Sequence, residues 1–166
     1  DRTSAALGEG EVRVFNFDAQ AGDQVSLMAS PVDPGAIDLF IEVYSPAGEL
    51  LAVDDDGGWR TDPVLVGLQL AEAGTYRVEV RSFSGLDTGE FTLAIESGAV
   101  YIAPDGEIAG SLDLTTAPQF TLEADDLAVY SFTADAGAVI TLEGEGISFE
   151  IYAADGGADY TVEQNT

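Results

Sequence analysis

The chain has 166 residues, with 31 acidic and five basic side chains for a formal net charge of −26; every basic residue is Arg, and Lys, His and Cys are absent. This composition excludes Ser-His-Asp and Cys-His catalysis, Schiff-base lysines, zinc sites built from Cys and His, and disulfides. The acidic surface also excludes nucleic acid and anionic membranes as partners, because phosphate groups are bound by Lys and Arg.

Short apolar blocks with a period of two residues predict β-strands along the first half of the chain. In chain order they fall at residues 12–17, 25–29, 38–44, 50–53, 64–70, 75–80 and 90–95. Gly, Pro, Asp and Asn separate them, as expected for an antiparallel β-sandwich. A sustained helical period is lacking, and no apolar run approaches the roughly 20 residues of a membrane-spanning helix. We therefore predict an all-β fold with neither membrane insertion nor an export signal in the sequence.

The second half of the chain repeats part of the first. Residues 127–142 follow the same order as residues 12–27: an aromatic-polar-Phe strand, then Ala-Gly, then an alternating strand. Residues 147–156 match residues 40–48 in the same way. An internal repeat of this kind indicates a duplicated structural unit.

The two predicted domains, residues 1–97 and residues 98–166, differ in the strands they contain. The first has only about ten residues before its aromatic strand, whereas the second has a longer leading segment but lacks the two closing strands. An incomplete sandwich leaves an open edge that a strand from a neighbouring chain can complete. We therefore expect two tandem antiparallel, jelly-roll-like β-sandwiches, the second being shorter and completed by a neighbour. The alternatives are that the sequence is a piece of a longer protein, or that the second copy folds with fewer strands.

Six short motifs follow one another along the first copy. They are Phe15-Asn16-Phe17, Ala21-Gly22, Asp38-Leu39-Phe40-Ile41, Asp54-Asp55-Asp56, Ala73-Gly74-Thr75-Tyr76-Arg77-Val78 and Gly89-Glu90-Phe91-Thr92-Leu93. This order resembles the bacterial pre-peptidase C-terminal domain family over about residues 8–97, with the second half as a degenerate partial copy. The resemblance implies a β-sandwich module of secreted hydrolases and surface proteins, outside a prokaryotic cell or at its surface.

The strongest candidate site is the acidic turn Asp54-Asp55-Asp56, which follows a predicted strand. Three adjacent carboxylates repel one another unless water or a cation lies between them, and calcium prefers several oxygen ligands. Asp38 begins the preceding strand, and the family resemblance also implies calcium near these two motifs. We predict a calcium site formed by Asp38, Asp54, Asp55 and Asp56, with Asp54 and Asp56 as the main ligands. The alternative is an acidic turn that is solvated.

Trp59, the single tryptophan, lies in a Gly- and Asp-rich segment. Its ring can stack on a sugar or anchor a partner chain, or else cover the end of the sandwich. Arg77 and Arg81 share one face of a strand with Glu79 between them, and we expect them to pair with neighbouring carboxylates or to mark an interchain contact. Aromatic residues that alternate within strands are expected in the core or in cross-strand pairs: Tyr44, Tyr76, Phe91, Tyr130 and Phe132.

These observations favour a protein that is not an enzyme. One tryptophan in two small sandwiches offers little of the aromatic cleft that a glycosidase needs beside its paired carboxylates. We predict a non-catalytic extracellular structural subunit of a surface or filamentous assembly, which self-associates by strand exchange or edge pairing. Two alternatives stay open: an accessory module of a secreted hydrolase that aids secretion, folding or substrate attachment, and a calcium-dependent adhesion or carbohydrate-binding module. A polysaccharide or another protein is the other expected class of ligand.

Overall fold

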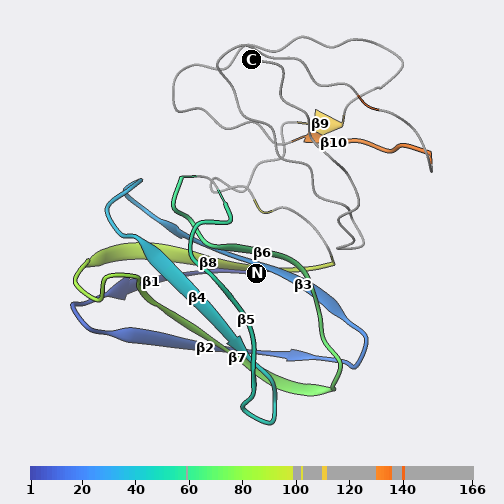
Figure 1. The fold of residues 1–166 in the computed structure, drawn as a ribbon, viewed down its shortest axis with the longest axis horizontal. Helices are drawn as coiled ribbons and strands as arrows, with labels where there is room; N and C mark the ends of the chain where they lie inside the picture. The colour runs from blue at the N-terminus through green and yellow to red at the C-terminus, as the bar shows by residue number, and fades with distance from the viewer. Residues whose placement is uncertain (59, 99–101, 103–109, 112–129, 136–139, 141–166) are drawn as a thin grey trace.

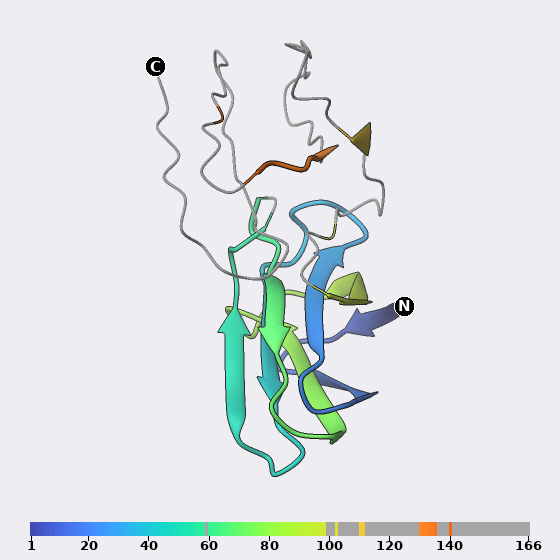
Figure 2. The ribbon, with the colours of Figure 1, turned by 90° about the vertical axis from the view of Figure 1, so that its right-hand side faces the viewer.

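The computed structural model describes residues 1–58, 60–98, 102, 110–111, 130–135 and 140. Strands β1 to β8, between residues 2 and 97, form two four-stranded antiparallel sheets that lie face to face (Figure 1, Figure 2). The predicted all-β antiparallel sandwich is confirmed for this part of the chain. Within the described residues there is no helix of the length and apolarity that a bilayer crossing requires.

Each sheet joins strands from opposite ends of the sandwich sequence. The first sheet has the order β1-β8-β3-β6, with bounds Arg2–Leu7, Gly89–Ser97, Gln24–Pro31 and Val64–Gln69. The second sheet has the order β2-β7-β4-β5, with bounds Val12–Ala19, Gly74–Ser82, Leu39–Tyr44 and Leu50–Asp54. Because β1 pairs with β8 and β2 with β7, the earliest strands are held by the latest ones in both sheets.

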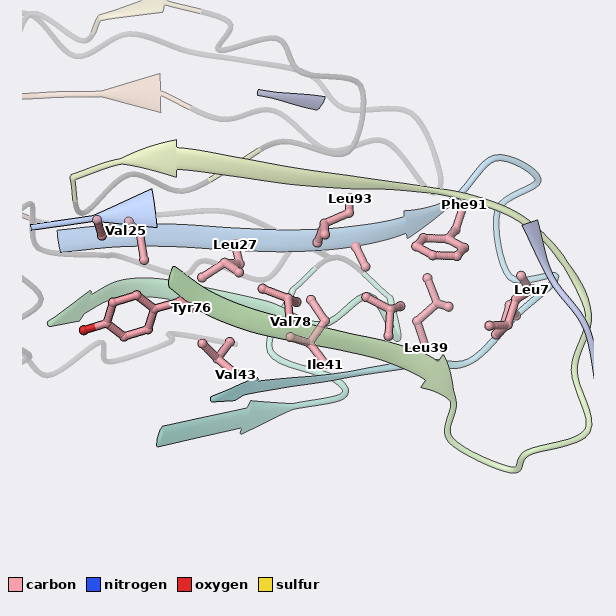
Figure 3. Packing of buried hydrophobic residues seen from close by; sticks show 14 of the residues in the cluster. Leu7, Val25, Leu27, Leu39, Ile41, Val43, Tyr76, Val78, Phe91 and Leu93 are labelled. Carbon is pink, nitrogen blue, oxygen red and sulfur yellow. The ribbon is translucent and has the colours of Figure 1, made fainter. Parts of the chain in front are cut away.

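The core lies between the two sheets, and Figure 3 shows its side chains pointing toward one another. Leu27 and Leu93 come from the first sheet, Ile41 and Val78 from the second, and each is at most 2% exposed. Burial of each such side chain stabilises the fold by roughly 1.5–3 kcal/mol. The period of two that predicts the strands is therefore the same pattern that fills the core.

All seven predicted strands are present, with bounds that differ by at most two residues. The additional strand is β1, whose side chains are mostly exposed and small apart from the buried Leu7. It forms because its backbone pairs with β8 continuously, from Arg2 opposite Ala94 to Leu7 opposite Gly89. No strand was predicted in the roughly ten residues before the aromatic strand, yet these residues complete a sheet of four strands.

Few residues of the predicted second domain, residues 98–166, are described. They include two short strands that pair in parallel, β9 (Gly110–Ser111) and β10 (Tyr130–Ser131). The second sandwich and its completion by a neighbouring chain otherwise lie outside the described residues, and both stay predictions.

Part of the outer face of the first sheet, over β3, β6 and β8, is covered by an apolar side chain from beyond β8. Met28 and Ala94 point away from the main core, yet each is only 2% exposed. They form a second apolar cluster with Val64 and with Ile102, which lies beyond β8. Ile102 therefore packs on the outside of this sheet, and we name Gly98 and Ile102 together the covering segment.

Ser26 holds the start of this covering segment. Its hydroxyl, which is fully buried, donates to the Gly98 carbonyl (2.8 Å) and accepts from the Gly67 N–H (3.0 Å). The Gly98 N–H donates in turn to the Gln24 carbonyl (2.8 Å). These bonds tie the residue after β8 to β3 and β6, so the first sheet positions the beginning of the second half of the chain.

Candidate functional site

The acidic turn after β5 is organised by Asp54. One carboxylate oxygen of Asp54 accepts hydrogen bonds from the N–H groups of Gly57 (2.9 Å) and Val64 (2.7 Å). A Cβ on Gly57 would lie 2.6 Å from that oxygen, so the close approach requires glycine. Burial raises the pKa of Asp54, the two N–H groups oppose this rise, and the charges of Asp55 and Asp56 add to it. Asp54 therefore serves to close the turn.

Asp38 and Asp87 bring two more carboxylates to the same end of the sandwich. Oδ1 of Asp38 is buried and has no hydrogen-bond partner among the described residues. Burial raises the pKa of Asp38, and the charges of Asp56, Asp87 and Asp55 raise it further. The carboxylate of Asp87 instead accepts hydrogen bonds from two serine hydroxyls at 2.8 and 3.0 Å, which lower its pKa. Sequence analysis missed Asp87, because it lies far along the chain from Asp38 and only the fold brings the two together.

The predicted calcium ligands do not form a compact set in the part of the chain that is described. No three Asp, Glu, His or Cys residues there lie close enough together to hold a metal ion. Asp54 uses one oxygen within its own loop, whereas Asp38, Asp55 and Asp56 interact through their charges. Calcium binding by these four residues stays a prediction, with Asp87 as an additional neighbour.

The outer face of the second sheet carries three rows of side chains that run across its strands. Residues directly opposite each other in neighbouring strands share a face of the sheet. The first row contains Val12, Arg81 and Phe40. The second row contains Val14, Glu79, Glu42 and Val53, and the third contains Asn16, Arg77, Tyr44 and Leu50. We name this surface the open face.

Arg77 and Arg81 form the centre of the open face. Cζ of Arg77 lies 3.9 Å from the centroid of the Tyr44 ring, and Cζ of Arg81 lies 4.1 Å from that of Phe40. Each arginine also pairs with a glutamate of the second row, at 3.9 Å for Arg81. The prediction that both arginines pair with neighbouring carboxylates is therefore confirmed, and the aromatic rings beneath them are an addition that the structure supplies.

Strand β2 forms a long edge beside the open face. It pairs with β7 over eight consecutive residues, from Val12 opposite Arg81 to Ala19 opposite Gly74, without a register shift. On its other side no described strand is hydrogen-bonded to it. The side chains of Val12 and Val14 are 43% and 53% exposed. Among the described residues, this side of the β2 backbone therefore has no partner strand.

A cavity of about 380 Å³ opens between the two sheets next to β2. Phe15 and Phe17 of β2 and Ile95 of β8 supply apolar lining, and Asp18 and Glu96 supply acidic lining. The uncovered edge and the cavity therefore share one strand.

The other predicted positions fall into three groups. Trp59 lies outside the described residues, so its partner-binding role stays a prediction. Tyr76 and Phe91 are 1% and 0% exposed and lie in the core, as predicted. Tyr44 takes the second predicted role, a cross-strand pair, because it lies opposite Arg77.

Comparison with known proteins gives similarity to solved structures alone. No model of a protein family matches, and no curated protein matches. A periplasmic inhibitor of g-type lysozyme from Aeromonas hydrophila is 13% identical, with a TM-score of 0.46 over 58% of this chain and 84% of that chain. The pre-peptidase C-terminal domain of a Bacillus anthracis collagenase is 12% identical, with a TM-score of 0.45 over 58% of this chain and 88% of that chain. Membership of the pre-peptidase C-terminal family stays a prediction from the sequence motifs.

Proposed function

We propose that this protein is a non-catalytic structural module of an extracellular prokaryotic assembly, and that it joins neighbouring copies by edge pairing of β2. The observation that carries the proposal is the unbroken eight-residue ladder of β2, with no described strand on its far side. A row of unpaired N–H and C=O groups is a template on which another strand adds.

The three other edge strands differ from β2 in being protected or short. β5 has five residues, and its ladder with β4 shifts register between Val43 and Tyr44. β6 has a shift in its ladder with β3, between Val25 and Leu27, and β1 has six residues. β2 contains neither Pro nor Lys, has no register shift and is the longest of the four. Short length, bulges, Pro and Lys are the usual defences of an edge, so β2 is the edge best suited to pairing.

Composition and resemblance support the remaining parts of the proposal. His, Cys and Lys, three residue types that enzymes commonly use for nucleophilic or proton-transfer chemistry, are absent from the sequence. The extracellular location rests on the motifs that resemble pre-peptidase C-terminal domains. A net charge of −26 favours surroundings rich in salt or divalent cations, which screen the repulsion between copies.

The mass of the purified chain in solution is the first test. Light scattering over a range of protein concentrations and salt concentrations is expected to show species larger than the monomer, increasing with both. A monomer under all conditions would contradict the proposal and favour the accessory module of a secreted hydrolase. Binding of a polysaccharide by a chain that stays monomeric would favour the adhesion module.

Cysteine cross-linking locates the contact, because the chain has no cysteine of its own. Val12→Cys, Val14→Cys, Asn16→Cys and Asp18→Cys are oxidised singly and in pairwise mixtures. In an antiparallel pair of β2 strands from two copies, each of these residues lies opposite a residue of the same face in the other copy. A single register of pairing therefore gives disulfides only in those single variants or mixtures whose cysteines lie opposite each other. Ser4→Cys, at an exposed position of the edge strand β1 in the other sheet, is the matched control. Cross-linking at Ser4 without any at β2 would reject β2 as the paired edge.

A further inference from the structure

The open face differs in charge from the rest of this acidic chain. Its three rows hold two of the five arginines, Arg77 and Arg81, together with two glutamates, Glu42 and Glu79, and these four charges sum to zero. Asp18, in the row beyond these three, adds one negative charge at the border of the face. The whole chain has a net charge of −26. Two copies repel each other over most of their surface, and the repulsion is smallest where the local charge vanishes.

The charges of the open face are already paired and partly withdrawn from water. The side chains of Glu79 and Glu42 are 19% and 21% exposed, and those of Arg81 and Arg77 are 33% and 40% exposed. Each arginine keeps its glutamate and its aromatic ring when another surface covers it. Covering a satisfied ion pair costs less than covering an unpaired charge, so this face can be buried without leaving a charge unpaired.

Exposed apolar side chains surround these charges. Eight large hydrophobic side chains are exposed in the described residues, and six of them lie on the open face or at its border: Val12, Val14, Leu50, Leu51, Val53 and Phe83. Phe83 reaches the face through its ring contact with Phe40, at 6.2 Å between centroids. Aromatic residues and arginine at the centre of an apolar patch are the composition of protein interfaces.

We infer that the open face binds the open face of a second copy of this chain, related by a two-fold axis. Positive and negative side chains alternate along β7, in the order Arg77, Glu79, Arg81, so a rotated copy can place arginine against glutamate. A strongly acidic partner would need arginines without carboxylate partners, and a basic partner would be drawn to the acidic remainder of the surface. A second copy of the chain requires neither unpaired arginines nor the acidic remainder of the surface for binding.

The area of the face sets the strength of this contact. Four strands about 4.8 Å apart and about six residues long, at about 3.4 Å per residue, cover roughly 400 Å². Stable complexes bury about 800 Å² on each partner, so one pair of open faces associates weakly. Edge pairing through β2 would set two open faces side by side and double this area. The two contacts therefore strengthen each other.

The two contacts also run in different directions. Edge pairing extends the second sheet within its own plane, whereas face packing stacks sheets about 10 Å apart. Two different two-fold contacts on one subunit close into a tetramer where their axes intersect at right angles, and they extend into a filament where the axes do not meet. Either larger assembly rests on the proposed function of β2, but the face contact does not, because it would form a dimer alone.

Charge reversal at the centre of the face is the test. The dimer dissociation constant is measured by sedimentation equilibrium for the full chain, for Arg77→Glu, and for Arg2→Glu as a control of equal charge change away from the open face. We expect Arg77→Glu to raise the constant about tenfold or more and Arg2→Glu to change it less than about threefold. Circular dichroism and a melting curve verify that each variant folds. Equal effects of both substitutions would overturn the inference.

A charge swap and the β2 cysteines separate the two contacts. Arg81→Glu is expected to weaken the dimer, and combining it with Glu42→Arg is expected to restore it in part, because the ion pair between these two positions and the net charge of the face return. If β2 cross-links form in the Arg77→Glu background while its self-association is weakened, both contacts hold. If β2 cross-links never form but Arg77→Glu still weakens the dimer, the contact between open faces is supported and the proposed edge pairing of β2 is rejected. Loss of binding to an acidic protein or polysaccharide in Arg77→Glu, without any change in mass, would reject the second copy as the occupant.

Discussion

The two outer faces of the sandwich differ in how far their apolar side chains are exposed to solvent. On the first sheet, Met28 and Ala94 are 2% exposed, and Ile102 packs against them. On the second sheet, Val14 and Val53 are 53% and 46% exposed. One sandwich therefore covers part of one outer face within the chain and leaves large apolar side chains of the other face exposed.

The side chains on each face account for this difference. The covered face carries small or flexible residues, such as Ser26, Met28 and Ala94, over which a segment can pack closely. The open face carries Arg77 and Tyr44, a bulky stacked pair that stays stable beside water. An exposed apolar rim around such a pair is more informative about function than the exposure of any single valine.

The largest expected effect comes from placing the same charge on each face. Met28→Asp buries an unpaired carboxylate and should lower the free energy of unfolding by about 3–5 kcal/mol. Val14→Asp, on the open face, should change it by less than about 0.5 kcal/mol. Urea denaturation of both variants measures the difference. Similar losses in both would show that the two faces are not distinguished by covering.

Calcium should stabilise the acidic end without changing assembly. Extracellular calcium sites are weak, so about 10 mM calcium should raise the free energy of unfolding by about 1–3 kcal/mol, and a chelator should remove this gain. Asp38→Asn should abolish the gain, because Asp38 holds the buried oxygen without a hydrogen-bond partner among the described residues. Thermal melting and light scattering are recorded together. A larger change in mass with calcium than with sodium chloride of the same ionic strength would place the acidic end, not the open face, at a contact between copies.

Removal of one hydroxyl tests how the covering segment is held. Ser26→Ala leaves the Gly67 N–H without its acceptor and the Gly98 carbonyl without its donor. Loss of these buried hydrogen bonds should lower the free energy of unfolding by about 1–3 kcal/mol. Ser4→Ala, at an exposed position of β1, is the control and should have little effect. Equal stability of the two variants would mean that Ser26 does not hold the segment.

Acidification should give the smallest effect and should stabilise the fold. Burial raises the pKa values of Asp38, Asp54 and Asp62 above 3.8 in the folded protein, so their ionisation opposes folding. Stability is therefore greatest near and below the unfolded value and is lost as pH rises through the folded values. The lowered pKa of Asp87 acts in the opposite sense, because its ionised form favours folding. This contribution to the free energy of unfolding is lost only when the pH falls below 3.8.

Thermal melting between pH 7 and about pH 4 measures this dependence. The melting temperature should rise on acidification, with less than about 1 kcal/mol from each carboxyl because water screens partly exposed groups. Asp38→Asn should be more stable than the parent at pH 7 and should show a weaker dependence on pH. A melting temperature that falls over this range would contradict the raised pKa values.

Much of the sandwich could be predicted from the sequence because strand alternation is a local property. A buried run such as Leu39, Ile41 and Val43 reveals its strand and its inward face without knowledge of the partner strand. The pairing of Arg77 and Arg81 with carboxylates also followed from their shared face. β1 was missed for the same reason, since only Leu7 among its side chains is buried and its pairing with β8 is made by the backbone.

The candidate sites depended on contacts between distant parts of the chain. No local pattern indicates that Asp87 approaches Asp38, or that Ile102 covers Met28 while nothing described covers Val14. The sequence by itself determined seven strands, the acidic charge and the absence of His, Cys and Lys, because these follow from residue type and spacing. The tertiary structure alone decided strand order, the uncovered edge of β2 and the balanced charges of the three rows on the open face, because register brings charges together from strands that lie far apart in the chain.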